Sequence, residues 1–351
     1  MLNRVIREDL EFIVNHDLDW DKFDNSTILI TGANGFLAAY IVETFLHLND
    51  KYDKNIKVLA LVRNRDNIQA KFSHHSGRDD LEFIIQDVCK PLKTDESIDY
   101  IIHLASQASF AHFESDPVGT LNANTIGTTN LLMLAYQKQV KDFLYFSSGA
   151  VLGVIPDDKI PAKETDYGYL DPTDIKSCYA ESKRMAENIC VSWNHQYEVP
   201  FKIIRPSYVY GPGMKTFNDD RIFPKFISNV ISNKDIEIED YNNKTRAFCY
   251  LADATIATFF ILLKGENTNV YNVGIEDETS ILDFANLIIE MYGDRGINLI
   301  KKEKTESLRY TDNIVQRSCF DISKLKQIGW YPRFDLKNGI KRTVEHYEES
   351  D

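Results

Sequence analysis

The chain of 351 residues is long enough to bury one large core, or one large domain with a smaller lobe. Hydrophobic residues make up 43% of it and charged residues 26%, which is ordinary for a globular protein. A formal net charge of −13 argues against nucleic acid or an anionic membrane as a partner, because both require a basic surface.

Cysteine usage and hydropathy predict a cytoplasmic protein without a bound metal. The five cysteines are scattered, odd in number and contain no C-x-x-C pair, so neither a disulfide framework nor a zinc site is indicated. No apolar run approaches the ~20 residues that span a bilayer. The start of the chain lacks the apolar core of a signal peptide.

The order of elements predicts a doubly wound α/β fold. Residues 1–25 are expected to form one acidic amphipathic helix laid against the domain that follows. Short apolar runs then alternate with helical patterns, as in a parallel sheet with right-handed crossovers. The expected strands are 26–31, 56–62, 81–86, 99–105, 142–148 and 201–206, and the clearest helices are 120–137 and 178–196.

The alternation ends near residue 205. The stretch "YGPGMKTFNDDR" is rich in turn formers, and the helices and short strands after it are irregularly spaced. We therefore expect one domain over 26–205 and a smaller lobe over 206–351, partly woven into the first and closing over a cleft.

The stretch "ILITGANGFLAAYIVETF" carries a glycine turn between a strand and a helix. Gly32, Gly35 and Ala38 give the pattern G-x-x-G-x-x-A. Gly32 allows a tight turn, Gly35 lets backbone amides approach a pyrophosphate, and Ala38 lets the helix pack closely on the sheet. At the start of an alternating series, this pattern predicts a dinucleotide site.

The end of the second expected strand indicates which dinucleotide binds. An NAD site usually has an acidic residue here, but this chain has Val62 followed by Arg63 and Arg65. A guanidinium suits a 2′-phosphate, so NADP(H) is favoured and NAD(H) stays possible. Alternatively, the arginines are solvated loop residues, or Asp66 reaches the ribose from an unusual loop.

A Y-x-x-x-K pair, Tyr179 and Lys183, falls on the helix expected over 178–196. The spacing places both on one face, where an ammonium would lower the pKa of the phenol and allow proton exchange with a substrate oxygen. Ser147 and Ser148 end the fifth strand, and Ser148 could bond the same oxygen. The alternative for these serines is a hydrogen-bonded strand terminus.

Together these stretches resemble the extended short-chain dehydrogenase/reductases, in particular the nucleotide-sugar epimerase/dehydratase group. The resemblance runs from about residue 26 to about 345 and rests on "TGANGFLA", "IIHLAS", "NTIGTTNLL", "FSSGAVLG", "YAESK", "RPSYVYGPG", "TRAFCYLAD", "YNVG" and "FDISKLKQIGW". It implies a Rossmann-type domain, an NAD(P)-dependent enzyme, a nucleotide-sugar substrate and a homodimer formed by the helices over 120–137 and 178–196.

The resemblance also implies roles for individual residues. Ser148, Tyr179 and Lys183 would be catalytic. His103 falls within an expected strand, so we expect it to be a core residue. The cofactor would be bound by Gly32, Asn34, Gly35, Phe36, Leu37, Arg63, Asp87, Val88, Leu104, Ala105, Ser106, Tyr179 and Lys183. The sugar nucleotide would be bound by Ser148, Gly149, Tyr208, Arg221, Arg246 and Arg317.

Two positions bear on the reaction. Dehydratases of this group carry an Asp-Glu pair where this chain has Gly149 and Ala150, and UDP-glucuronate decarboxylases usually carry a glutamate at Ala150. The resemblance therefore favours hydride transfer at sugar C4 alone. We expect an NADPH-dependent reductase of a 4-keto(-6-deoxy) nucleotide hexose such as dTDP-4-keto-6-deoxyglucose. A 4-epimerase, a decarboxylase-like enzyme and a non-catalytic NADP sensor are alternatives in falling order.

Overall fold

A seven-stranded parallel sheet forms the centre of the computed structural model, which describes residues 2–66, 68–217, 219, 221–238, 244–302 and 317–349. The strand order is β11-β6-β5-β4-β1-β2-β3, with every neighbouring pair parallel. The strands are β1 (Thr27–Thr31), β2 (Lys57–Val62), β3 (Leu81–Ile85), β4 (Tyr100–His103), β5 (Asp142–Phe146), β6 (Lys202–Pro206) and β11 (Asn269–Val273). The doubly wound fold and its six expected strands are confirmed.

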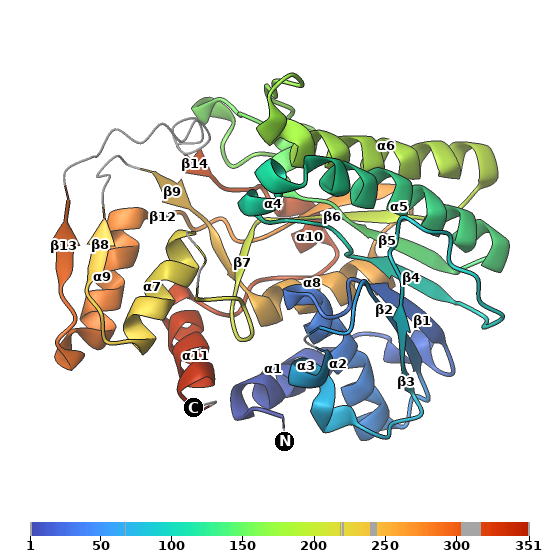
Figure 1. The fold of residues 1–351 in the computed structure, drawn as a ribbon, viewed down its shortest axis with the longest axis horizontal. Coiled ribbons are helices and arrows are strands. Elements are labelled where there is room, and N and C mark those ends of the chain that lie inside the picture. Colours follow the sequence, from blue (N-terminus) through green and yellow to red (C-terminus); the bar gives the residue numbers. More distant parts are fainter. Residues whose placement is uncertain are drawn as a thin grey trace.

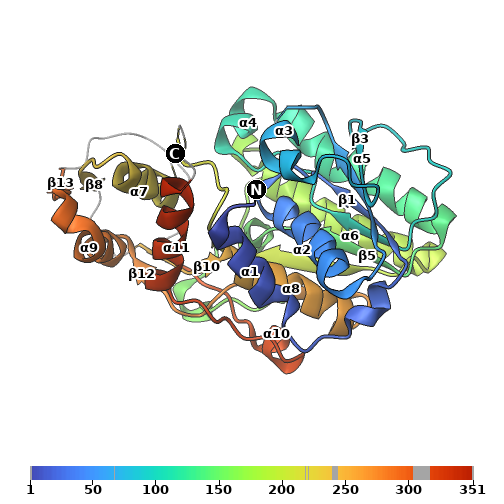
Figure 2. The same ribbon diagram turned by 90° about the horizontal axis from the view of Figure 1, so that it is seen from below.

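Helices cover both faces of this sheet (Figures 1 and 2). The long helices α5 (Pro117–Lys138) and α6 (Cys178–Tyr197) lie side by side on one face. Helices α2 (Phe36–Tyr52) and α8 (Leu251–Lys264) lie on the other. The strand order reverses between β1 and β4, so the crevice at the carboxyl ends of these strands is where such a sheet binds ligands.

The part of the chain after residue 206 carries three small sheets and its own helices. These elements are β7 (Tyr208–Tyr210) with β10 (Phe248–Tyr250), β8 (Ile236–Ile238) with β13 (Leu299–Lys301), β9 (Thr245–Arg246) between β12 (Thr279–Ser280) and β14 (Arg317–Ser318), α7 (Ile222–Ile231), α9 (Ile281–Tyr292) and α11 (Leu336–Glu348). Three short helices complete the fold: α3 (Ile68–Phe72), α4 (Phe110–Ser115) and α10 (Ser323–Gln327). Among the described residues, no helix combines the length and apolarity that a membrane span requires.

The N-terminal segment departs from the expected single helix over 1–25. Helix α1 (Arg4–Val14) is followed by turns and a short 3-10 helix (Trp20–Phe23). Trp20 and Phe23 are both buried in the core, and aspartates between and beside them favour turns over helix. The break in the helix lets both aromatic side chains reach the core.

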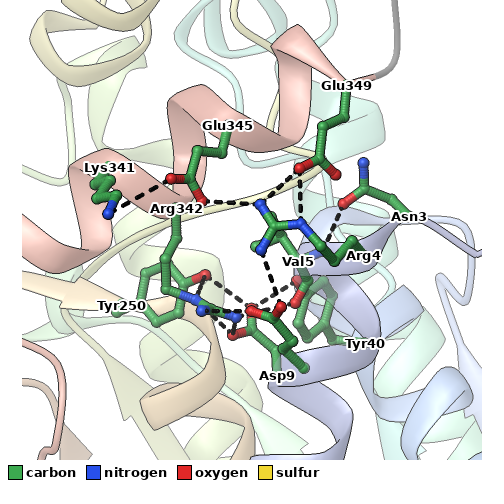
Figure 3. A network of polar contacts seen from close by, with 11 residues as sticks. Asn3, Arg4, Val5, Asp9, Tyr40, Tyr250, Lys341, Arg342, Glu345 and Glu349 are labelled. Carbon is green, nitrogen blue, oxygen red and sulfur yellow. Dashed lines mark hydrogen bonds and ion pairs between the residues drawn. The ribbon is translucent and has the colours of Figure 1, made fainter.

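A buried polar network joins α1 to three other elements (Figure 3). Asp9 of α1 is fully buried and forms an ion pair with Arg342 of α11, at 2.7 Å between Oδ1 and Nη2. Its other oxygen accepts hydrogen bonds from the hydroxyls of Tyr40 (3.0 Å) and Tyr250 (2.8 Å). This carboxylate therefore ties α1, α2, β10 and α11 together.

The network makes Asp9→Ala strongly destabilising. We expect a loss of about 3–5 kcal/mol, because the change leaves Arg342 and two tyrosine hydroxyls without their buried partner. Chemical and thermal unfolding of the full chain measure it. Glu8→Ala is the matched control, since Glu8 also pairs with Arg342 but is 43% exposed; it should cost under about 1 kcal/mol. Equal effects of the two changes would contradict this account of the network.

Candidate active site

The glycine turn lies between β1 and α2, at the carboxyl edge of the sheet. Gly32 has φ +66°, and a Cβ placed there would lie 2.9 Å from Cα of Ala105. Within the described part of the chain, no side chain caps the N-terminus of α2, which begins after Gly35 with Phe36 and Leu37. The turn thus presents helix N–H groups that suit a phosphate.

Other residues expected at the cofactor lie in this turn or in the segments that follow β2 and β3. Asn34 donates a hydrogen bond to the backbone oxygen of Asp66 at 3.1 Å, which ties the turn to the loop after β2. Arg63 and Arg65 in that loop are exposed. Asp87 accepts a hydrogen bond from the backbone of Cys89 at 2.8 Å.

Two further contacts shape the crevice beyond β4. Gly127 of α5 packs so closely on Val88 that a Cβ there would lie 2.9 Å from its side chain. Leu104 and Ala105 follow β4, and Ala105 donates its backbone N–H to Thr31 at 3.1 Å. The Ser106 hydroxyl is buried and finds no partner among the described residues. An unsatisfied hydroxyl beside the glycine turn fits a bound dinucleotide, because a buried polar atom without a partner is costly.

Helix α6 holds Tyr179 and Lys183 on the face that covers the end of β5. Lys183 is buried and donates from Nζ to the backbone oxygen of Phe146 at 2.6 Å. Its ammonium lies 5.9 Å from the ring centroid of Tyr179. Ser148 follows β5, lies near enough to Tyr179 to lower the pKa of its phenol, and accepts the backbone N–H of Ala150 at 3.1 Å. The structure thus brings the three expected catalytic residues together.

The electrostatics of this group differ from the expectation that Lys183 depresses the pKa of Tyr179. Burial raises the pKa of Tyr179, and the hydrogen bond with Ser148 opposes the rise only in part. The tyrosine ring stacks on Phe113 of α4 at 5.0 Å, which explains its poor solvation. Burial also lowers the pKa of Lys183 to about 7, against the opposing charge of Glu187.

A buried ion pair between α6 and β6 holds this arrangement in place. Glu187, two turns after Tyr179 on α6, accepts hydrogen bonds from Nε (2.8 Å) and Nη2 (2.6 Å) of Arg205 on β6. Its carboxylate also accepts the Ser147 hydroxyl at 2.5 Å. Ser147 is therefore a hydrogen-bonded strand terminus, which is one of the two alternatives that the sequence allowed for these serines. Ser148 instead lines the cavity described next.

A cavity of about 490 Å³ opens beside Ser148. Its walls come from the segment after β5, the end of β6, and strands β7, β9 and β14. The lining residues are Ser148, Gly149, Ala150, Leu152, Gly153, Ile155, Pro156, Asp157, Ile160, Ala162, Pro206, Ser207, Tyr208, Arg246, Arg317, Ser318, Cys319 and Phe320. Five of the six expected substrate residues line this cavity.

Arginines supply the positive charge of the cavity. Arg246 on β9 and Arg317 on β14 lie on paired strands, one residue out of register. Arg317 is also ion-paired with Glu278. The sixth expected residue, Arg221, is not on the described cavity wall; it is paired with Asp219 at 2.6 Å. The hydroxyls of Ser207 and Tyr208 are buried and lack partners among the described residues, so they suit a polar ligand.

The wall next to Ser148 is apolar and tightly packed. A Cβ at Gly149 would lie 2.0 Å from the ring of Phe320, so this ring occupies the space of a side chain at 149. Ala150 adds only a methyl group. Asp157, which is exposed, is the one carboxylate among the described lining residues. The described wall beside Ser148 thus offers no buried carboxylate, and Tyr179 is not among its lining residues.

His103 is a core residue, as its position in a strand predicts. Its Nδ1 contacts the Thr31 hydroxyl at 2.8 Å and its Nε2 the Thr128 hydroxyl at 3.1 Å. Burial lowers its pKa to about 3, so the ring stays neutral.

Sequence reasoning missed Phe113, Glu187, Arg205 and Phe320. Glu187 had a signal, since it lies eight residues after Tyr179 on the same helix face. Phe113 and Phe320 come from distant segments, and no local pattern marks them.

Comparisons with known proteins identify relatives that share most of the length of this chain. Residues 28–274 match the model of the NAD dependent epimerase/dehydratase family. The UDP-glucuronic acid decarboxylase 6 of Arabidopsis thaliana is 29% identical over 326 residues, which are 92% of this chain and 89% of that protein. The dTDP-D-glucose 4,6-dehydratase of Bos taurus is 30% identical over 344 residues, with coverage of 92% and 89%.

A solved structure shows the same fold. The UDP-glucose 4-epimerase of Thermotoga maritima superposes with a TM-score of 0.78 at 22% identity, covering 92% of this chain and 99% of that one.

The close approach at Gly32 makes Gly32→Ala damaging to cofactor binding. We expect about 10-fold or weaker affinity for NAD(H) or NADP(H), because the methyl group would push the turn away from Ala105 and add ~1–2 kcal/mol of backbone strain. Nicotinamide fluorescence on titration measures it. Gly77→Ala is the control. Gly77 has φ +86° but open space around it, so an alanine there adds backbone strain without a steric clash. Unchanged affinity in Gly32→Ala would remove the turn from the cofactor site.

Proposed function

Because the chain belongs to the NAD dependent epimerase/dehydratase family, we propose that it transfers hydride at C4 of a nucleotide-linked hexose. In this proposal the net reaction is the reduction of a 4-keto, often 6-deoxy, sugar by NADPH. All five cysteines are free thiols, which fits the reducing cytoplasm that we propose as its compartment.

One observation carries the choice of reaction: the packing of Phe320 against Gly149. Elimination of water needs an acid and a base besides the tyrosine. A carboxylate at position 149 would collide with the Phe320 ring, and Ala150 provides no ionisable group. Hydride transfer at C4 needs one proton donor, which Tyr179 supplies.

Each residue has its own role in the proposed reaction. When bound, the reduced nicotinamide supplies hydride to the carbonyl carbon. Tyr179 donates its phenolic proton to the C4 oxygen as negative charge develops there, and a raised pKa keeps that proton in place at neutral pH. Ser148 donates a hydrogen bond to the same oxygen. Lys183 would hold the cofactor ribose and would provide a nearby positive charge when protonated.

The phosphates and the nucleotide would lie toward the arginines. Arg246 and Arg317 line the cavity from β9 and β14 and match the charge of a pyrophosphate. Arg63 follows β2, where a ribose 2′-phosphate would lie, so NADP(H) is our preferred cofactor. The family dependence on NAD makes NAD(H) the comparison to run.

A 4-epimerase is the second candidate, because it uses the same tyrosine and the same apolar wall. It would hold its cofactor tightly and return it unchanged. The relatives named as UDP-glucuronic acid decarboxylases supply a third substrate to test, UDP-glucuronate.

Tyr179→Phe should lower turnover by about 10²–10⁴-fold, because it removes the proton donor and keeps the ring that stacks on Phe113. The assay follows NADPH and NADH oxidation with dTDP-4-keto-6-deoxyglucose. Tyr331→Phe, at an exposed tyrosine after α10, is the control and should leave turnover unchanged.

The other outcomes separate the candidates. Bound NAD that is never consumed, with a product changed only at C4, would make the protein an epimerase. Carbon dioxide released from UDP-glucuronate would make it a decarboxylase and show that this reaction needs no carboxylate at position 150. No turnover of any of these sugars, with intact NADP(H) binding, would favour a non-catalytic sensor.

The proposal includes a homodimer through α5 and α6. These helices pack against each other on one face of the sheet (Figure 1). They also expose large apolar side chains. Leu121 and Met133 on α5 are 37% and 43% exposed, and Met185 on α6 is 54% exposed. Pairing these helices with those of a second copy would bury the apolar surface in a four-helix bundle.

Met185→Arg should shift the protein toward monomer, because it places a charge in the proposed dimer interface. Analytical ultracentrifugation across a range of concentrations measures the shift. Ile300→Arg, on the exposed strand β13, is the control and should not change the mass. A wild-type protein that stays monomeric at high concentration would contradict the proposal.

A further inference from the structure

Two neighbouring histidines and a buried glutamate form a cluster that the proposed reaction does not use. Glu43 lies in the middle of α2, and His74 and His75 belong to the short 3-10 helix (Ser73–His75) that follows α3. Nε2 of His74 lies 3.0 Å from one carboxylate oxygen of Glu43, and Nε2 of His75 lies 2.7 Å from the other. One atom from each residue lies within 4.8 Å of the others.

The charge of Glu43 lacks a permanent counter-ion. Its side chain is 7% exposed, and among the described ion pairs it has only the two histidines as partners. The nearby Arg78 is used by Asp50 and Asp80 instead. A buried carboxylate is costly unless a positive charge or several hydrogen bonds compensate it.

Protonation of both histidines is a poor source of that charge. The two imidazole rings lie with their centroids 4.1 Å apart, so two imidazolium ions there would repel each other. A single divalent cation would instead use the lone pairs of two neutral rings and the charge of the carboxylate. It would satisfy all three groups at once.

We propose that Glu43, His74 and His75 bind a divalent transition-metal ion of the Zn²⁺ type. Two imidazole nitrogens and one carboxylate oxygen are a donor set that Zn²⁺ and its neighbours prefer. In a tetrahedral zinc site the ligand atoms lie about 3.4 Å from one another. The ligand atoms of this cluster already lie within 4.8 Å of one another, and water would complete the coordination. The site departs from the expected absence of metal, which rested on cysteine spacing alone.

The ion would fix the connection between β2 and the rest of the first domain. Glu43 belongs to the helix that starts at the glycine turn, and the histidines end the segment that starts at Arg63. A metal bound here would hold this segment against α2. The inference is independent of the proposed reaction, because it concerns only binding.

Cobalt titration of the chelator-treated, untagged full chain tests the site. We expect one Co²⁺ per chain, with the intense visible absorption of a four- or five-coordinate ion, and its displacement by Zn²⁺. His74→Gln and His75→Gln should each weaken binding by at least about 10-fold, and the double variant should abolish it. His47→Gln is the control, because His47 lies on the same helix but pairs with a single glutamate, Glu11.

X-ray absorption at the zinc edge of the wild type gives a second readout that requires no variant to fold. Two imidazoles and one or two oxygen ligands would support the site. Absence of stoichiometric binding, a spectrum without imidazole scattering, or unchanged affinity in the double variant would overturn it.

Discussion

The buried ion pair between Glu187 and Arg205 is the interaction on which the candidate site depends. It joins the helix that carries Tyr179 and Lys183 to strand β6, and its carboxylate also holds Ser147 at the end of β5. Ser148, the next residue, is thereby placed against Tyr179. Arg205 further donates to the backbone of Glu164 at 2.7 Å and to the Tyr167 hydroxyl at 3.0 Å. One fully buried guanidinium thus orients α6, two strand ends and a segment that borders the cavity.

Much of the fold could be predicted from sequence, because the buried parallel strands are continuous apolar runs between turn signals. Strand β11 was not predicted, because its sequence, NVYNV, carries two asparagines and is not a continuous apolar run. One of them, Asn272, is fully buried and donates to the backbone of Ala162 at 3.0 Å. A polar residue that finds its partner 110 positions away gives no local signal.

Some residues of the candidate site could likewise be predicted from the sequence, and others could not. Gly32, Tyr179 and Lys183 could be predicted because strand–turn–helix geometry and helical spacing are local properties. The stacking of Phe113, the Phe320 wall and the cluster of Glu43 with His74 and His75 arise from tertiary contacts. The pKa of Tyr179 shows the limit most clearly, since a nearby ammonium is visible in the sequence, whereas the burial that outweighs it is not.

The N-terminal helix has a consequence for how the cavity recognises charge. Arg246 and Tyr250 lie four residues apart along β9 and β10, about 13 Å in extended chain. Tyr250 is held by Asp9, so one end of this stretch is fixed while the other presents a guanidinium to the cavity. An arginine on a tethered strand loses less conformational entropy when it binds an anion than one on a free loop. Helix α1 contributes no residue to the described cavity wall, yet its Asp9 holds the far end of the stretch that carries Arg246.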